Sequence, residues 1–349
     1  MIKLNETPVR TARNFNINNI KLDNIEIRRR LKPFQSAEVF LESSKDVALR
    51  EIYDIVLEYG ICDLLTEQAS NYELTVNINS KMKNTVMVDF KFDEENDYLV
   101  DKIFIDAKPD TKSNVIIKYT SKDDLEYFHN GDIKLRAGEN SEVNITFVNL
   151  LNTKSNNFIA IENEILDGAK VNSYMIDFGG KYSISNYYSN IIGKNANNNL
   201  STIYLGKENQ VFDLNYIAEL YGEKSSVNFE VQGALKDSSK KHFKGTIDFK
   251  RGAKKAKGNE NEACMLLSDK ARSLALPMLL CSEEDVEGNH STSSGKIGDK
   301  ELFYIMSRGF DEKSAMKLMV RAKFNKILES IKNDELKNEI IYEIDKRLD

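Results

Sequence analysis

The chain has 349 residues, of which 41% are hydrophobic and 30% are charged, a balance that argues against extended disorder. Its formal net charge of −6 argues against a protein that coats nucleic acid, because such binding needs a concentrated cationic surface. The cysteines Cys62, Cys264 and Cys281 share no CxxC spacing, so the sequence supports neither a disulfide framework nor a four-thiolate zinc site and favours a reducing compartment.

The first fifteen residues, MIKLNETPVRTARNF, contain no apolar core of signal-peptide length. No window approaches the roughly 18 apolar residues of a membrane span. We therefore expect a cytoplasmic protein that does not bind membranes. Histidine occurs only at His129, His242 and His290, so a metal site would have to rely on carboxylates or on ligands from a partner.

The N-terminal region, residues 1–71, is expected to form a small, partly helical cap. From Ser44 onward, apolar residues recur at the spacing of a helix with one buried face, and Gly60 is a suitable stop. The apolar positions are Val47, Leu49, Ile52, Ile55, Val56 and Tyr59.

From Tyr72 the apolar period changes to two, which predicts β-strands. The predicted strands lie at 72–78, 84–92, 101–107, 113–120, 132–137, 142–150, 173–178, 200–205, 226–232, 245–250 and 264–267. Because no helical segment long enough for a crossover intervenes, residues 72–282 are predicted to be an all-β core.

A turn signature beginning with glycine recurs within this core, at Gly138, Gly168, Gly193, Gly222 and Gly252, at intervals of 30, 25, 29 and 30 residues. Such a period is typical of a solenoid, and short strands with glycine at each corner favour a β-helix. We expect each glycine to supply the positive φ of a tight corner. A β-sandwich with irregular hairpins is the alternative.

After Cys281 the strand period is expected to stop, which makes residues 283–349 a helical C-terminal region. Asp299 can cap a first helix that ends at Gly309, and Asp311 can cap a second. A third helix is predicted from about Asn333.

Eight basic residues gather between Lys240 and Lys257. Phe243 and Phe249 fall on inward strand positions, so they offer no stacking platform for bases. A solvated edge of the β-helix, where lysines block strand pairing, is the favoured interpretation, and we expect no nucleic-acid partner.

Motifs of nucleotide binding and hydrolysis are absent. The sequence contains no GxxxxGK[ST], GxGxxG, HExxH or GxSxG, so we expect no ATP hydrolysis by this chain. The main enzymatic alternative is a β-helix polysaccharide lyase or isomerase, but no pair of catalytic acids can be placed from the sequence.

The segment FKGTIDFKRGAKKAKGNENEACMLLSDKA (243–271), followed by Pro277, EGNHSTSSGKI and LFYIMSRGF, resembles the C-terminal half of SufB and SufD proteins. These are scaffold subunits of the SUF machinery, which assembles iron–sulfur clusters. The likeness extends from Phe243 to about Phe324, with additional support from the glycine repeat and from PVRT near Pro8. It implies a mainly β fold, a right-handed parallel β-helix core with small helical N-terminal and C-terminal regions.

Within that family the chain looks more like SufD than SufB. SufB proteins generally carry a cysteine after the aspartate-lysine pair where this chain has Ala271, so a central thiol for cluster building is absent. The SufD pattern of a histidine followed by small residues is present as His290 to Gly295. The resemblance implies that His290 is a cluster or metal ligand facing a SufB-like partner.

Each of these residues also has a purely structural interpretation. His290 could instead be a loop histidine bonded to a backbone carbonyl, and Glu287 belongs to the acidic segment that could orient it. Cys281 could handle sulfur or iron transiently or pack in the core, and Cys264 is interpreted as core. One histidine cannot hold a cluster alone.

The resemblance implies that an ABC-type ATPase similar to SufC docks on the C-terminal helices. The predicted partner-binding residues are Leu302, Phe303, Tyr304, Met306, Arg308, Gly309, Phe310, Met316 and Met319. An ordinary helical core is the alternative for these residues, although methionines give an adaptable surface.

The function we expect is a non-catalytic SUF scaffold subunit that pairs with a SufB-like chain. It would hold no cofactor alone; the cluster would form transiently with the partner, and ATP would bind to the ATPase. Two alternatives stay open, the β-helix lyase or isomerase and a SUF scaffold that dimerises with itself.

Overall fold

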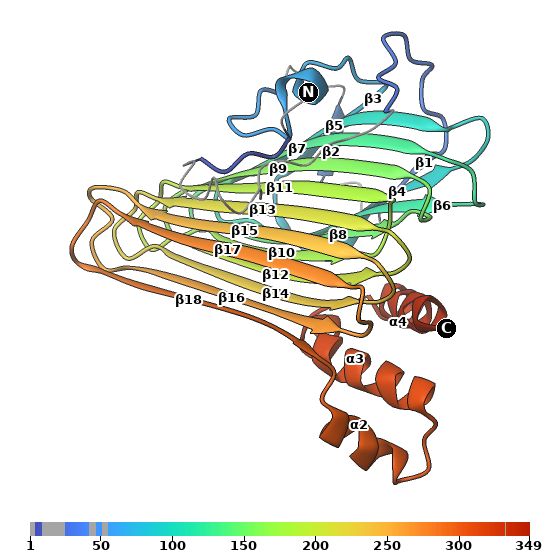
Figure 1. Ribbon diagram of the computed structural model, residues 1–349. Coiled ribbons are helices and arrows are strands. Elements are labelled where there is room, and N and C mark those ends of the chain that lie inside the picture. The colour runs from blue at the N-terminus through green and yellow to red at the C-terminus, as the bar shows by residue number, and fades with distance from the viewer. Residues whose placement is uncertain (1–3, 9–24, 42–46, 51–54, 332) are drawn as a thin grey trace.

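The computed structural model describes residues 4–8, 25–41, 47–50, 55–331 and 333–349, with the backbone alone at 47–50, 82–84 and 299. Two long sheets face each other along the molecule (Figure 1). Sheet A consists of β1 (Ala37–Leu41), β4 (Lys81–Phe92), β6 (Lys112–Ser121), β8 (Glu142–Leu150), β10 (Lys170–Asp177), β12 (Asn197–Gly206), β14 (Ser226–Leu235), β16 (Ala256–Leu266) and β18 (Val286–Lys296). Sheet B consists of β2 (Val47–Arg50), β3 (Tyr72–Ile78), β5 (Tyr98–Ala107), β7 (Phe128–Ala137), β9 (Asn156–Ile165), β11 (Tyr182–Ile191), β13 (Val211–Leu220), β15 (Lys240–Phe249) and β17 (Arg272–Cys281).

The chain alternates between the two sheets, so each coil adds one strand to each. Neighbouring strands are parallel and in register; Tyr182 lies beside Val211, which lies beside Lys240. Among the described strands, antiparallel pairs occur only at the start, where β1 pairs with β4 and β2 with β3. The expected parallel β-helix is therefore confirmed.

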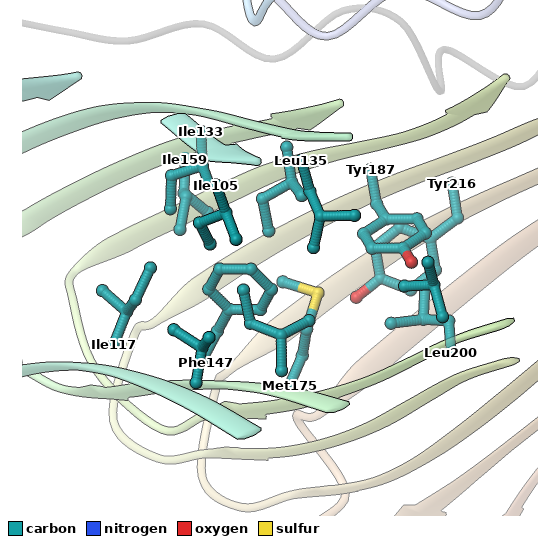
Figure 2. Packing of buried hydrophobic residues seen from close by; sticks show 14 of the residues in the cluster. Ile105, Ile117, Ile133, Leu135, Phe147, Ile159, Met175, Tyr187, Leu200 and Tyr216 are labelled. Carbon is teal, nitrogen blue, oxygen red and sulfur yellow. The ribbon is translucent and has the colours of Figure 1, made fainter. Parts of the chain in front are cut away.

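The interior of the coils is filled by alternate residues of both sheets. Figure 2 shows Ile133 and Ile159 of sheet B pointing toward Phe147 and Met175 of sheet A. All four are at most 5% exposed, and burying a side chain of this size stabilises a fold by about 1.5–3 kcal/mol. The period-two pattern of the sequence thus produces the core of the β-helix.

Only some of the recurring glycines serve the purpose expected of them. Positive φ is confirmed at Gly168 and Gly252, but after the other three glycines it falls two residues later, for example at Lys224. Gly222 is needed because the corners stack closely: a Cβ there would lie 1.8 Å from the backbone oxygen of Gly193. Glycine is required at this position because the backbones of successive coils approach too closely to leave room for a Cβ.

An asparagine ladder follows the outer face of sheet A. Asn114, Asn144, Asn172 and Asn199 lie in register. The Nδ2 of each of the last three donates to the Oδ1 of the asparagine in the preceding coil at 2.8–3.0 Å. The last coil repeats the bond, from Asn289 to Asn259 at 3.0 Å. The ladder fixes the register of the coils, as asparagine ladders do in stacked sheets.

The C-terminal helices cover the part of this outer face that lies near the C-terminal ends of the strands. α3 (Glu312–Leu328) and α4 (Asp334–Leu348) pack on sheet A through a shared apolar cluster, and both lie beside that sheet in Figure 1. The rings of Phe178 and Phe324 are stacked, with 6.4 Å between their centroids. Asp311 caps α3 as expected, because its side chain accepts from the Ser314 amide. Asn333, near the predicted start of the third helix, caps α4 by accepting from the Leu336 amide.

The N-terminal region covers the outer face of sheet B. Leu4, Ile55 and Leu65 pack against Phe158 and Ile184 of that sheet. The helix expected from Ser44 to Tyr59 is wrong within the described residues: 47–50 is strand β2, and 55–57 is not helical. Residues 42–46 and 51–54 lie outside the described part. The alternation of Val47 and Leu49 also fits a strand, and pairing with β3 decides between the two. The short α1 (Asp63–Thr66) follows.

The coils continue past the expected end of the strand period at Cys281. β18, at 286–296, pairs with β16 over its whole length. Its sequence is polar because it forms the edge of sheet A and needs no apolar alternation. The first C-terminal helix, α2 (Asp299–Met306), has Gly298 rather than Asp299 as its N-cap.

The basic segment is solvated only in part, and it does not lie at the edge of the sheet that was expected. β15 lies inside sheet B, and its Lys241 and Lys244 are fully buried beside carboxylates. Phe243 and Phe249 are buried in the core, as their strand positions predicted.

Candidate functional site

The C-terminal end of the β-helix is open. β17 and β18 are the last strands of sheets B and A, and neither has a second neighbour among the described residues. Every residue of β18 after Val286 is exposed. An edge strand of this kind presents backbone groups that can pair with another chain.

The two edges differ in their free backbone donors. In a parallel ladder, the N–H groups of alternate residues point to opposite sides. The amide of Arg272 donates to Ser239, just before β15, and the amide of Ser282 donates to Phe249 of β15. The N–H groups of odd-numbered residues of β17 therefore point to the free edge, where Pro277 lacks the central donor. Ile297 donates to β16, so the even-numbered residues from Val286 to Ser294 face the free edge of β18, without interruption.

His290 lies on β18 at this open end. It is in register with Glu260 of β16, and the burial of β16 alternates so that Glu260 faces the interior of the coils. Residues in register on parallel strands share a face. His290 is therefore placed on the interior side of an exposed edge, directly above Glu260.

A buried ionic cluster lies in the coils beneath His290. The Lys241 Nζ is 2.7 Å from the Glu262 Oε1, and the Tyr204 hydroxyl donates to the same oxygen at 3.1 Å. The side chains of Lys241 and Glu262 are 0% and 1% exposed. A charge pair is retained in an interior only when partners this close compensate for lost hydration.

Glu260 is the unusual member of the cluster, because neither of its carboxylate oxygens has a hydrogen-bond partner in the described structure. It packs against Gly245, where a Cβ would lie 1.9 Å from the Glu260 Oε2. Burial, together with the nearby Glu262, raises the pKa of Glu260 to about 8. At neutral pH this side chain is mainly a neutral acid.

None of these cluster residues was among the predicted site residues. Glu260 and Glu262 occupy inward positions of β16, in a stretch between the predicted strands 245–250 and 264–267 where no strand was predicted. Cys264 follows on the same face, and burial raises the pKa of its thiol, which agrees with the expected core role. Ala271 is also buried.

The other predicted site residues lie apart from His290. Cys281 is exposed at the end of β17, next to the turn into β18, whereas His290 lies four residues beyond Val286, about 13 Å along the strand. Glu287 points to the outer face, where its carboxylate lies 2.9 Å from the Lys257 Nζ. The described residues contain no group of three or more potential ligands placed to hold a metal ion.

The predicted partner-binding helix is α2, which projects away from the β-helix in Figure 1. Phe303 and Tyr304 are 73% and 59% exposed, and Met306 and Phe310 are exposed as well. The Arg308 guanidinium lies 5.2 Å from the centre of the Tyr304 ring. The helix ends at Met306 rather than at the expected Gly309, which lies three residues further on with a φ of +97°. Leu302, Met316 and Met319 are half-buried.

A lyase needs acids and cations gathered on one face of the coils. Asp213 and Lys244 do meet on the outer face of sheet B, but both are fully buried under residues 4–8. No helix in the described part of the chain is long and apolar enough to cross a membrane.

The chain matches the family described as SUF system FeS cluster assembly, SufBD core domain, over residues 90–323. It is 26% identical to the iron-sulfur cluster assembly protein SufD of Bacillus subtilis over 166 residues, 48% of this chain and 38% of that protein. It is 21% identical to SufD of Escherichia coli over 245 residues, 70% and 58% of the two chains. A SufBD family protein of Pyrococcus horikoshii is 34% identical over 154 residues, 44% and 33% of the two chains. The matched segments span from about a third to under two thirds of these relatives.

Proposed function

Because the chain belongs to the SufBD core domain family of the SUF system, we propose that it is a non-catalytic scaffold subunit that pairs with a SufB-like chain and binds a SufC-like ABC ATPase. The observation that carries this proposal is the combination of an open, polar β-helix edge with a separate exposed apolar helix. Two surfaces of different chemistry suit two different partners.

The SufB-like chain is proposed to pair through β18. Its free edge offers an unbroken set of amide donors, whereas Pro277 interrupts the edge of β17. Strand addition to an open edge is a common mode of recognition, in which the main chain supplies most of the affinity. Pairing there would also bury exposed His290 between the two chains.

The ATPase is proposed to dock on α2. An exposed apolar cluster containing Phe303 and Tyr304 is unusual unless a partner covers it. Aromatic residues contribute strongly to binding when they are buried in an interface. Since α3 is fixed to sheet A, movement of a bound ATPase would reach the β-helix through the α2–α3 connection.

His290 is proposed to act as a ligand for the cluster, which is the cargo of the system. A neutral imidazole can bind iron, but the remaining ligands would have to come from the partner. Ala271 leaves this chain without the thiol of the SufB pattern, so the SufB-like chain would supply the principal sulfur ligand.

The edge is tested by Thr292→Pro, with Thr292→Ala as its matched control. Thr292 directs its N–H to the free edge, so proline removes one donor there and leaves the ladder with β16 complete. We expect Thr292→Pro to lose co-purification with the SufB-like chain and to keep the ATPase. If Thr292→Pro binds both partners as well as Thr292→Ala does, pairing through β18 is wrong.

The helix is tested by Phe303→Glu, which places a charge in the apolar cluster. We expect this variant to lose the ATPase in co-purification and to keep the SufB-like chain. Tyr342→Glu serves as the control, because Tyr342 is another exposed aromatic residue, 65% exposed on α4. Equal ATPase binding by the two variants would remove α2 as the docking surface.

A further inference from the structure

A second buried charge cluster lies on the outer face of sheet B, opposite the interior face that carries Lys241. The Lys244 Nζ on β15 is 2.7 Å from the Asp213 Oδ1 on β13, and both side chains are 0% exposed. His242 lies beside them, with its Nδ1 3.7 Å from the Asp213 Oδ2. The chain's own N-terminal segment, residues 4–8, covers this cluster.

Asn5 is the residue that enters the cluster, and each of its polar atoms has a partner. Its backbone N–H donates to the Ile61 carbonyl at 2.7 Å, and its side-chain Nδ2 donates to the Asp213 Oδ1 at 2.6 Å. Its Oδ1 accepts from the Asn186 amide at 3.0 Å. Its backbone oxygen accepts from the Lys244 Nζ at 2.6 Å and from the Asn215 amide at 3.4 Å.

These contacts distinguish asparagine from the other residue types. The Asp213 carboxylate requires a donor where Nδ2 lies, so an aspartate at position 5 would place two carboxylates against each other. Asn5 also has a φ of +50°, a left-handed conformation that asparagine and glycine adopt more readily than most residues. Asparagine therefore fits this position in two ways: its side-chain amide supplies the required donor, and its backbone readily adopts the left-handed conformation.

Covering the cluster with residues 4–8 carries a desolvation cost that opposes their binding. Burial of Asp213 and Lys244 removes water from two charges, and that cost offsets much of the gain from the new hydrogen bonds. When the segment leaves, both charges recover water while their contact with each other remains. The bound and released states are thus closer in free energy than the number of hydrogen bonds suggests.

We propose that the outer face of sheet B carries a peptide-binding site specific for an asparagine in a left-handed turn. The site consists of Asp213, Lys244, Asn186 and Asn215, and residues 4–8 of the chain occupy it. The same site binds a separate peptide of that sequence when the chain's own segment is displaced. This inference is independent of the scaffold function.

The experiment uses the full chain carrying Asn5→Asp, which displaces its own segment by charge repulsion, and a fluorescent peptide, LNETP, with the sequence of residues 4–8. We expect saturable binding in fluorescence anisotropy. Wild-type chain should bind at least about tenfold more weakly, because its tethered segment competes at a high effective concentration. The peptide LDETP should also bind at least about tenfold more weakly.

A matched pair of lysine variants tests where the peptide binds. In the Asn5→Asp chain, Lys244→Met should abolish binding, whereas Lys240→Met should not, because Lys240 is an exposed residue of the same strand. Thermal melts establish that each variant is folded. Should Asn5→Asp fail to fold, Asn5→Gly keeps the left-handed backbone and removes only the amide.

Three results would each overturn the proposal. The first is the absence of saturable binding to the folded variant up to about 1 mM peptide, the effective-concentration range of a short flexible linker. The second is equal affinity for LNETP and LDETP. The third is unchanged binding in the Lys244→Met chain.

Discussion

Replacing Glu260 by glutamine is predicted to flatten the pH dependence of stability. In the folded protein the pKa of Glu260 is raised from 4.5 to about 8 by burial and by Glu262, whereas in the unfolded chain it keeps its ordinary value. Between these two pH values the folded state holds a proton that the unfolded chain has released. The stabilisation is therefore complete below about pH 4.5, declines as the pH rises, and is lost above about pH 8.

The size of this effect follows from the same values. Each pH unit in that window corresponds to about 1.4 kcal/mol, so the wild type should lose roughly 5 kcal/mol from this group between pH 4.5 and pH 8. A glutamine side chain cannot titrate, so the variant should not show this loss. The comparison needs urea unfolding of both proteins at half-unit intervals from pH 5 to pH 8.5, because other buried acids titrate in both proteins and cancel in the difference. If the difference in unfolding free energy stays constant with pH, Glu260 is not the buried neutral acid described above.

Two further substitutions test the buried ionic pair and the stacked corners by urea unfolding. Lys241→Met should lower the free energy of unfolding by about 3–5 kcal/mol, because it leaves the Glu262 carboxylate buried and uncompensated. Adding Glu262→Gln should recover most of that loss. If Lys241→Met alone is as stable as the wild type, the buried pair is contradicted. Gly222→Ala should lower the free energy of unfolding by about 1–3 kcal/mol, because its Cβ meets the carbonyl of Gly193. In the control Gly295→Ala the new Cβ meets nothing within 4 Å, so its stability should stay within about 0.5 kcal/mol of the wild type. Equal effects of the two substitutions would contradict the close stacking.

The strands that the sequence predicts most clearly have one face in the core and one face in water or under a helix. β8, with its EVNITFVNL alternation, matches the prediction at both ends. β9 and β11 were not predicted because the N-terminal region covers the outer face of sheet B, so both of their faces are buried. Burial on both sides removes the period of two on which the prediction depends.

The site was only partly predictable for a related reason. His290 stands out as a single histidine in a recognisable pattern, and the exposed aromatic residues of α2 follow from helical spacing. The contact between Lys241 and Glu262 depends on how the coils fold the chain back across the interior, which the sequence does not encode locally. Asn5 meets Lys244 across 239 residues, and no pattern near either residue indicates that contact.

The most direct test of the proposed scaffold role is native mass spectrometry of the chain co-expressed with a SufB-like and a SufC-like protein. The proposal predicts a complex that contains all three proteins. Thr292→Pro should remove the SufB-like subunit alone, and Phe303→Glu should release the ATPase from this chain. A chain that stays monomeric in the presence of both proteins would contradict the proposed function.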